Sequence, residues 1–155
     1  MAKRYWLFKS EPTSYSWDHL VKDGVAEWDG VRNFQARNLL RDEIKEGDEV
    51  LFYHSSTTPT AVVGIAIVVK GGHPDASAWD MKSAHPDPKS TPENPIWSVV
   101  DIKAQKKFPR AVTLEEMRKE PRLAKMALLR RGMRLSVQPV TPEEFAAVCQ
   151  MGGVK

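Results

Sequence analysis

Runs of apolar residues, either alternating with polar ones or continuous, mark the extended parts of this chain. Residues 4–9 are rich in aromatic and apolar side chains, and Ser10, Glu11 and Pro12 end the run. Such residues are typical of strands bounded by turns. The same pattern predicts strands over residues 49–54, 61–70, 96–103 and 134–137, a weaker one over 107–112 and a short extended piece over 25–28.

Helical spacing and capping signals predict short helices between these strands. Ser16 can cap a helix over residues 17–22, and Gly24 can end it. Residues 31–40 have apolar side chains at helical spacing. In this second helix we expect four side chains to turn inward, namely Phe34, Ala36, Leu39 and Leu40.

The C-terminal third carries two capping boxes, in which Thr precedes Glu by three residues. Thr113 and Glu116 open a helix that Pro121 interrupts, and Thr141 and Glu144 open one that runs to about Gln150. Between them, residues 122–131 are predicted as a helical stretch. Its apolar stripe is Leu123, Met126 and Leu129, and Gly132 closes it.

Residues 71–95 differ from the rest, because they combine Pro and Gly with several Ser, Asp and Asn. This composition predicts a long irregular loop, and loops of that length are commonly functional or mobile. The strands are not separated by regular crossover helices. We therefore expect an α+β protein, a small β-barrel of about six or seven strands decorated by short helices, in a single domain over residues 1–155.

Composition narrows the class of protein. The chain has 155 residues, of which Cys149 is the only cysteine, so no intrachain disulfide can form. Its longest apolar run, residues 61–69, is about half of what a membrane helix needs. We expect no membrane association and a cytoplasmic location. Five tryptophans is a high count for this length.

Charge is unevenly distributed. Residues 103–134 hold eleven Lys and Arg against three Asp and Glu, a local net charge of +8, while the rest of the chain carries −5. A concentration of positive charge is the electrostatic footprint of a nucleic-acid-binding face. A solvated helical surface kept soluble by Lys and Arg explains the same pattern, and charge alone does not separate the two.

The sequence contains no pattern that makes a catalytic site. It lacks phosphate-cradling glycine loops, zinc-binding His and Cys motifs and a nucleophile elbow. His54 and Ser55 are adjacent at a predicted strand end, so their side chains point to opposite faces and do not form a base–nucleophile pair. We expect no enzyme activity, no cofactor and no metal site. A surface metal site at His73 and His85 is a weak alternative.

Aromatic residues beside amides are the distinctive feature. Trp28 precedes a turn and a helix that carries Asn33, and Trp79 lies in the polar loop, where core packing does not obviously explain it. Planar bases bind by stacking on aromatic faces, and amides read their edges. We assign Trp6 and Trp17 to the core and leave open whether Trp97 lines a pocket.

Five segments together resemble the EVE domain family. They are residues 5–12 (YWLFKSEP), 28–38 (WDGVRNFQARN), 52–55 (FYHS), 87–89 (DPK) and 97–102 (WSVVDI), and the resemblance extends over residues 3 to about 150. It implies a PUA-like barrel related to the YTH domain, which reads N6-methyladenine in an aromatic cage. EVE domains are proposed readers of modified bases in DNA or RNA, notably modified cytosine in DNA.

The resemblance also implies a site. Trp28 would be the first cage wall and Trp79 the second, with Lys9 and Ser10 along the floor and Asn33 at the base edge. The expected base-binding residues are Lys9, Ser10, Trp28, Asn33, Tyr53, His54, Ser55, Trp79 and Trp97. The expected phosphate-binding residues are Arg32, Arg37, Lys106, Lys107 and Arg110.

These observations predict a non-enzymatic nucleic-acid-binding protein that reads a modified base. Two alternatives remain open at this point. One is a small-molecule or nucleotide-processing enzyme that uses Glu11, His54 or the Asp- and His-containing loop. The other is a protein-interaction module whose partner binds the basic residues 103–134. The sequence does not distinguish DNA from RNA, nor does it set the oligomeric state.

Overall fold

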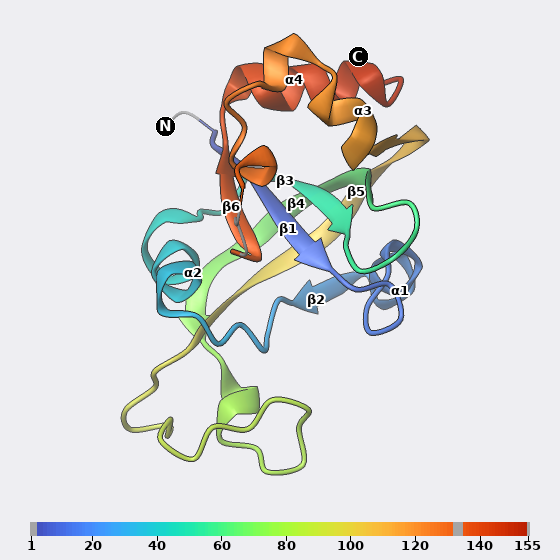
Figure 1. Ribbon diagram of the computed structural model, residues 1–155. Coiled ribbons are helices and arrows are strands. Elements are labelled where there is room, and N and C mark those ends of the chain that lie inside the picture. The colour runs from blue at the N-terminus through green and yellow to red at the C-terminus, as the bar shows by residue number, and fades with distance from the viewer. Residues whose placement is uncertain (1–2, 132–134, 155) are drawn as a thin grey trace.

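A computed structural model describes residues 3–131 and 135–154 of the chain. Its centre is a six-stranded sheet with the strand order β2-β5-β4-β3-β1-β6, surrounded by short helices (Figure 1). The α+β class predicted from the sequence is therefore confirmed. The strands are β1 (Tyr5–Ser10), β2 (Val25–Glu27), β3 (Glu49–His54), β4 (Ala61–Pro74), β5 (Ser98–Thr113) and β6 (Val137–Val140).

The sheet is mixed, since β1 runs parallel to β3 whereas the other neighbours are antiparallel. β2 and β6 are the two ends of this strand order, and no pairing within the described part of the chain joins them. The closed barrel expected from the sequence accordingly remains a prediction.

Both faces of the sheet are covered, and the alternation of β1 and β3 shows how. Trp6 and Phe8 of β1 enter one hydrophobic cluster, whereas Leu7 between them enters another. In β3, likewise, Phe52 belongs to the first cluster and Leu51 to the second. Successive side chains of a strand point to opposite faces, so a strand buried on both faces is almost continuously apolar. Trp6 and Trp17 are buried, as predicted.

The two N-terminal helices contribute buried residues to the first hydrophobic cluster, and the two C-terminal helices contribute to the second, so the two pairs cover opposite faces of the sheet. The C-terminal pair lies at the top of Figure 1. α1 (Trp17–Asp23) begins at the N-cap Ser16 and ends at Gly24, as the sequence predicts. α2 (Phe34–Asn38) continues into a π-helical turn, η1 (Leu39–Glu43). α3 (Leu114–Arg118) and α4 (Pro142–Met151) both begin with the predicted capping boxes, at Thr113 and Thr141.

Some sequence predictions fail in detail. Phe34 was expected to face inward, but its side chain is 59% exposed. The expected helix over 122–131 is replaced by two 3-10 turns, η3 (Pro121–Leu123) and η4 (Ala127–Leu129), because Met126 adopts an extended backbone conformation between them. Leu123 and Met126 are nevertheless buried, as their spacing suggested.

The strand boundaries also differ from the predictions. The two strands expected over 96–103 and 107–112 form one strand, β5. β4 extends to Pro74, into the segment predicted to be irregular, and a 3-10 turn, η2 (Ala76–Ala78), follows it. The last strand is β6 rather than residues 134–137; Arg134 and the predicted helix stop Gly132 lie outside the described residues.

None of the described helices is long and apolar enough to cross a membrane.

Candidate functional site

A cleft of about 940 Å³ opens beside the end of β1. Four separate segments form it: the β1 end with the turn that leads to α1, the stretch from Asp23 at the end of α1 through β2 to Arg32, His85 of the long loop, and Ser136 just before β6. In Figure 1 the end of β1, α1 and β2 converge at this place. The lining residues are Lys9, Ser10, Glu11, Ser14, Tyr15, Asp23, Val25, Ala26, Glu27, Trp28, Asp29, Gly30, Val31, Arg32, His85 and Ser136.

Two aromatic rings stand at right angles in this cleft. Tyr15 and Trp28 have ring centroids 6.2 Å apart and an interplanar angle of 80°. Trp28 is only 9% exposed, because it also packs on Phe8 and Phe52 of the sheet, with centroids 5.2 and 5.6 Å away. The Tyr15 hydroxyl donates to Asp23 over 2.8 Å. The core and a hydrogen bond thus hold both rings in place before any ligand binds.

The backbone after β2 is held at successive residues. Trp28 N donates to Val100 O over 2.8 Å and Asp29 N donates to Glu27 O over 2.9 Å. Gly30, with a φ of 77°, donates its N–H to the Asp75 carboxylate over 3.0 Å. This wall of the cleft is consequently tied both to the sheet and to the long loop.

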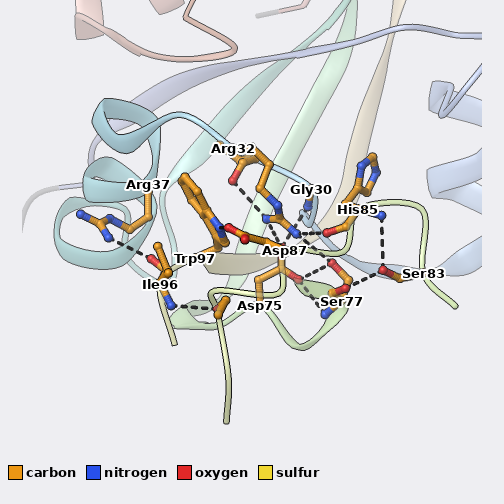
Figure 2. A network of polar contacts seen from close by, with 12 residues as sticks. Gly30, Arg32, Arg37, Asp75, Ser77, Ser83, His85, Asp87, Ile96 and Trp97 are labelled. Atoms are coloured by element: carbon orange, nitrogen blue, oxygen red, sulfur yellow. Dashed lines mark hydrogen bonds and ion pairs between the residues drawn. The ribbon is translucent and has the colours of Figure 1, made fainter. Parts of the chain in front are cut away.

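Asp75 is the centre of a polar network that fastens the long loop to this wall (Figure 2). Its side chain is 1% exposed. Oδ2 accepts from Gly30 N and from Arg32 Nη1, over 3.0 and 2.9 Å, and Oδ1 accepts from both the N–H and the hydroxyl of Ser77. Arg32 Nη2 additionally donates to His85 O over 2.5 Å.

Trp97 belongs to the same network. Its Nε1 donates to Asp87 Oδ2 over 2.6 Å, its ring stacks on Phe34, and the Arg32 guanidinium lies 5.4 Å from its centroid. Arg37 Nη1 donates to Ile96 O over 2.9 Å. Figure 2 shows these groups clustered around Asp75 and Asp87. Trp97, whose role the sequence left open, therefore packs within the loop anchor and is not among the lining residues of the cleft.

Burial and neighbouring charges shift several pKa values around the cleft. Burial lowers the pKa of Lys9. Burial raises the pKa of Asp29, and the nearby Asp75 carboxylate raises it further. Burial would also raise the pKa of Asp75, but hydrogen bonds from Ser77, Arg32 and Gly30 outweigh that effect, so its pKa is lowered. Asp75 is therefore the ionised partner of Arg32.

The structure brings together three of the predicted base-binding residues, Lys9, Ser10 and Trp28, all of which line the cleft. The other six are not among its lining residues. Asn33 caps α2, Tyr53 is buried in the second hydrophobic cluster, and His54 accepts from Trp17 N. Ser55 N donates to Ser10 O, and Trp79 is half-buried in the long loop.

The predicted phosphate-binding residues do not form one group. Arg32 lines the cleft but is bound to Asp75, and Arg37 is bound to Ile96 O. Lys107 is exposed on β5, and Arg110 pairs with Glu116. Lys106 borders a different cleft, of about 1080 Å³, between β5 and α4.

Sequence reasoning missed Tyr15 and Asp29 as cleft residues. Tyr15 lies close after the turn at Ser10, Glu11 and Pro12, which the sequence already associated with the site. Asp29 follows Trp28 directly and was assigned only to a turn. Their positions beside recognised residues were the available signal in both cases.

One group of side chains has donors suited to a metal ion. Glu27, His73 and Asp101 each offer one atom, and these atoms lie within 4.8 Å of one another. His73 Nε2 lies 2.8 Å from Asp101 Oδ1, so a hydrogen bond already accounts for their proximity. The expectation that the chain has no metal site stays a prediction.

The fold and this cleft can now be compared with known proteins. The model of the EVE domain matches residues 4–151, and the chain therefore belongs to the EVE domain family. It is 40% identical to the uncharacterized protein C21.03c of Schizosaccharomyces pombe, over 96% of this chain and 68% of that protein. It is 39% identical to thymocyte nuclear protein 1 of Danio rerio, over 94% of this chain and 71% of that protein.

Solved structures agree with this assignment. A hypothetical protein from Leishmania major superposes with a TM-score of 0.93 at 43% identity, covering 98% of this chain and 96% of that chain. Human thymocyte nuclear protein 1, solved in complex with 5-methylcytosine-containing DNA, superposes with a TM-score of 0.90 at 34% identity, covering 99% of each chain. A homologue of this chain thus binds DNA that carries a modified base.

Proposed function

We propose that this chain binds DNA carrying a modified cytosine and holds that base in the cleft that Tyr15 and Trp28 line, without catalysing a reaction. The observation that carries the proposal is the perpendicular aromatic pair in a polar cleft, 6.2 Å between centroids. The structure of a 34% identical homologue with 5-methylcytosine-containing DNA supports the choice of ligand.

The cleft has the parts that base recognition requires. A base that stacks on an aromatic side chain gains roughly 1–3 kcal/mol. Removing the base from a duplex costs a few kcal/mol, which stacking and edge contacts must offset. Because Trp28 and Tyr15 are already held by Phe8 and Asp23, little further ordering of these rings is needed on binding.

Phosphate contacts would come from outside the cleft. Several basic residues of segment 103–131 have no carboxylate partner within the described part of the chain. They include three on β5, namely Lys103, Lys106 and Lys107. Each phosphate neutralised on B-DNA steepens the fall of log K with log salt by about 0.9. We infer that such contacts supply affinity, whereas the cleft supplies the preference for a base.

A binding titration with matched oligonucleotides tests the proposal. Duplexes that differ only in one cytosine or 5-methylcytosine are titrated at two salt concentrations against the native chain and the Trp28→Leu variant. Leucine keeps an apolar side chain in the core and removes the stacking face. We expect a preference for 5-methylcytosine in the native chain and a loss of about 1–3 kcal/mol of binding free energy in the variant.

Trp79→Ala is the matched control, because Trp79 is a half-buried tryptophan outside the cleft lining. It should bind as the native chain does. Equal binding of both duplexes by all three proteins would make the chain a general nucleic-acid binder. Loss of the preference in Trp79→Ala alone would place the base elsewhere and overturn the proposed site.

A further inference from the structure

The cleft is rich in carboxylates. Glu11, Asp23, Glu27 and Asp29 line it, against the cations Lys9 and Arg32, and Arg32 is paired with Asp75. An anionic lining repels phosphate and favours a ligand edge that presents hydrogen-bond donors. The negative charge of the cleft therefore affects which base can bind there, and it does not help to bind the phosphate backbone of the DNA.

These carboxylates differ in what they already bind. Asp23 accepts from the Tyr15 hydroxyl, Glu27 lies 3.9 Å from His73, and Glu11 accepts from Ser56 over 3.4 Å. Asp29, in contrast, makes no side-chain hydrogen bond or ion pair with any other described residue. Burial and the neighbouring Asp75 raise the pKa of Asp29, and these effects outweigh those of His85, of its own backbone N–H and of Arg32, which favour the charged form.

The position of Asp29 is well defined although no other described residue hydrogen-bonds its side chain. Its own N–H donates to Glu27 O, and the neighbouring Trp28 and Gly30 donate to Val100 O and to Asp75. A base that lies against Trp28 is thus next to a carboxylate on a backbone fixed at three successive residues. A fixed partner loses little entropy when it binds, which favours its use for discrimination.

We propose that the Asp29 carboxylate accepts a hydrogen bond from the exocyclic amino group of the bound base and thereby selects cytosine-type bases over thymine. This inference rests on the proposed function of the cleft. Asp and Glu are the side chains that accept from cytosine N4. Thymine presents a carbonyl oxygen at the same position, so its O4 would face the carboxylate and be repelled.

5-Methylcytosine and thymine form a matched pair of ligands, because both carry the methyl group at position 5 and they differ at positions 3 and 4 of the ring. Oligonucleotides carrying one or the other at a single unpaired position are titrated against the native chain, Asp29→Asn and the control Asp42→Asn. Unpaired positions remove the differing cost of opening the two base pairs.

We expect the native chain to prefer 5-methylcytosine over thymine by about 5- to 150-fold, the range that one good base contact provides. Asp29→Asn should reduce this ratio to near one, since an amide can donate to O4 as well as accept from N4. Asp42→Asn, which removes an exposed carboxylate outside the cleft, should preserve the ratio. Thermal unfolding of each variant shows whether the fold is intact.

The outcomes distinguish the role proposed for Asp29 from the function proposed for the cleft. If the native chain prefers 5-methylcytosine over thymine and Asp29→Asn keeps that ratio, the role of Asp29 is wrong while the function of the cleft stands. If the native chain binds neither oligonucleotide, or binds both without sensitivity to Trp28→Leu, the proposed function itself is wrong.

Discussion

Single residues define the shape of the cleft wall, and Gly30 shows this most clearly. Its φ of 77° lies in the left-handed region, where side chains with a Cβ atom are strained. A Cβ atom at this position would also lie 2.6 Å from Nε2 of His85. Gly30 thus allows the long loop to pass directly over the wall that holds Trp28 and Asp29.

Gly30→Ala should therefore weaken both the fold and the site. Gly24 offers a matched control, because its φ is 78° but no atom lies within 4 Å of an added Cβ. Gly24→Ala should cost only the backbone strain of a side chain at a positive φ with a ψ of −70°, about 1–3 kcal/mol. Gly30→Ala should lower the free energy of unfolding by about 0.5–1.5 kcal/mol more, because the exposed His85 ring must leave its preferred rotamer to make room. Urea unfolding measures both, and equal losses would contradict the clash.

At the residue level, local motifs led the sequence prediction to residues that lie together in the structure, and the base-binding role of these residues stays a prediction. Trp28, Lys9 and Ser10 lie in motifs that the family resemblance identified, and all three line the cleft. The Arg32–Asp75 pair spans 43 positions, so no local pattern indicates that this arginine has a structural partner. Only the folded chain shows which charged residues are already bound.

At the scale of elements, the long loop is anchored rather than detached. Asp75 begins η2, and its carboxylate joins that turn to Gly30 and Arg32. Trp97, at the other end of the loop, stacks on Phe34 of α2. Both ends of the loop are thus fastened to the segment that forms the cleft wall.

Asp75→Ala should release this anchor. Removing one partner of a buried ion pair costs about 3–5 kcal/mol, because the other charge is left uncompensated. The exposed pair of Arg41 and Asp42, whose side chains are 49% and 52% accessible, offers the control. Asp42→Ala should leave the free energy of unfolding nearly unchanged, because an exposed ion pair contributes little.

The effect of Asp75 should depend on pH in a defined direction. Its pKa is lowered in the folded state, so its carboxylate stabilises the fold above the unfolded-state pKa of about 3.9. That contribution is lost as the pH falls through the lower folded value. The difference in stability between the native chain and Asp75→Ala should persist at pH 7 and shrink below about pH 4. A difference that grows toward acid would contradict the assignment.

Elements were predicted best where their pattern is regular. β3 and the caps of α1, α3 and α4 match the prediction because each rests on adjacent residues. β5 was split into two strands because its pairing with β4 shifts register at several points, which interrupts simple alternation. The continuous strand arises from pairing across the sheet, which the local sequence does not encode.

At the scale of the whole molecule, the proposed DNA binding has two parts, namely the cleft that would hold the base and the basic residues that would contact phosphate. The cleft lies at the junction of β1, β2 and the long loop, whereas Lys106 and Arg122 border the second cleft beside α4. The excess of positive charge seen in the sequence therefore does not line the candidate base site. Among the proposed phosphate contacts, Lys106 borders the second cleft, whereas Lys103 pairs with Val25, which lines the first.

The central claim is that the base lies against Trp28, and NMR tests it directly. The chain has five tryptophans, each of which gives an indole N–H signal in a ¹H–¹⁵N spectrum. On titration with a short oligonucleotide that carries one 5-methylcytosine, we expect the Trp28 indole and the amides of Tyr15, Asp29 and Gly30 to shift most. Large shifts confined to Trp79, to α4 or to the basic residues of β5, with Trp28 unmoved, would contradict the account.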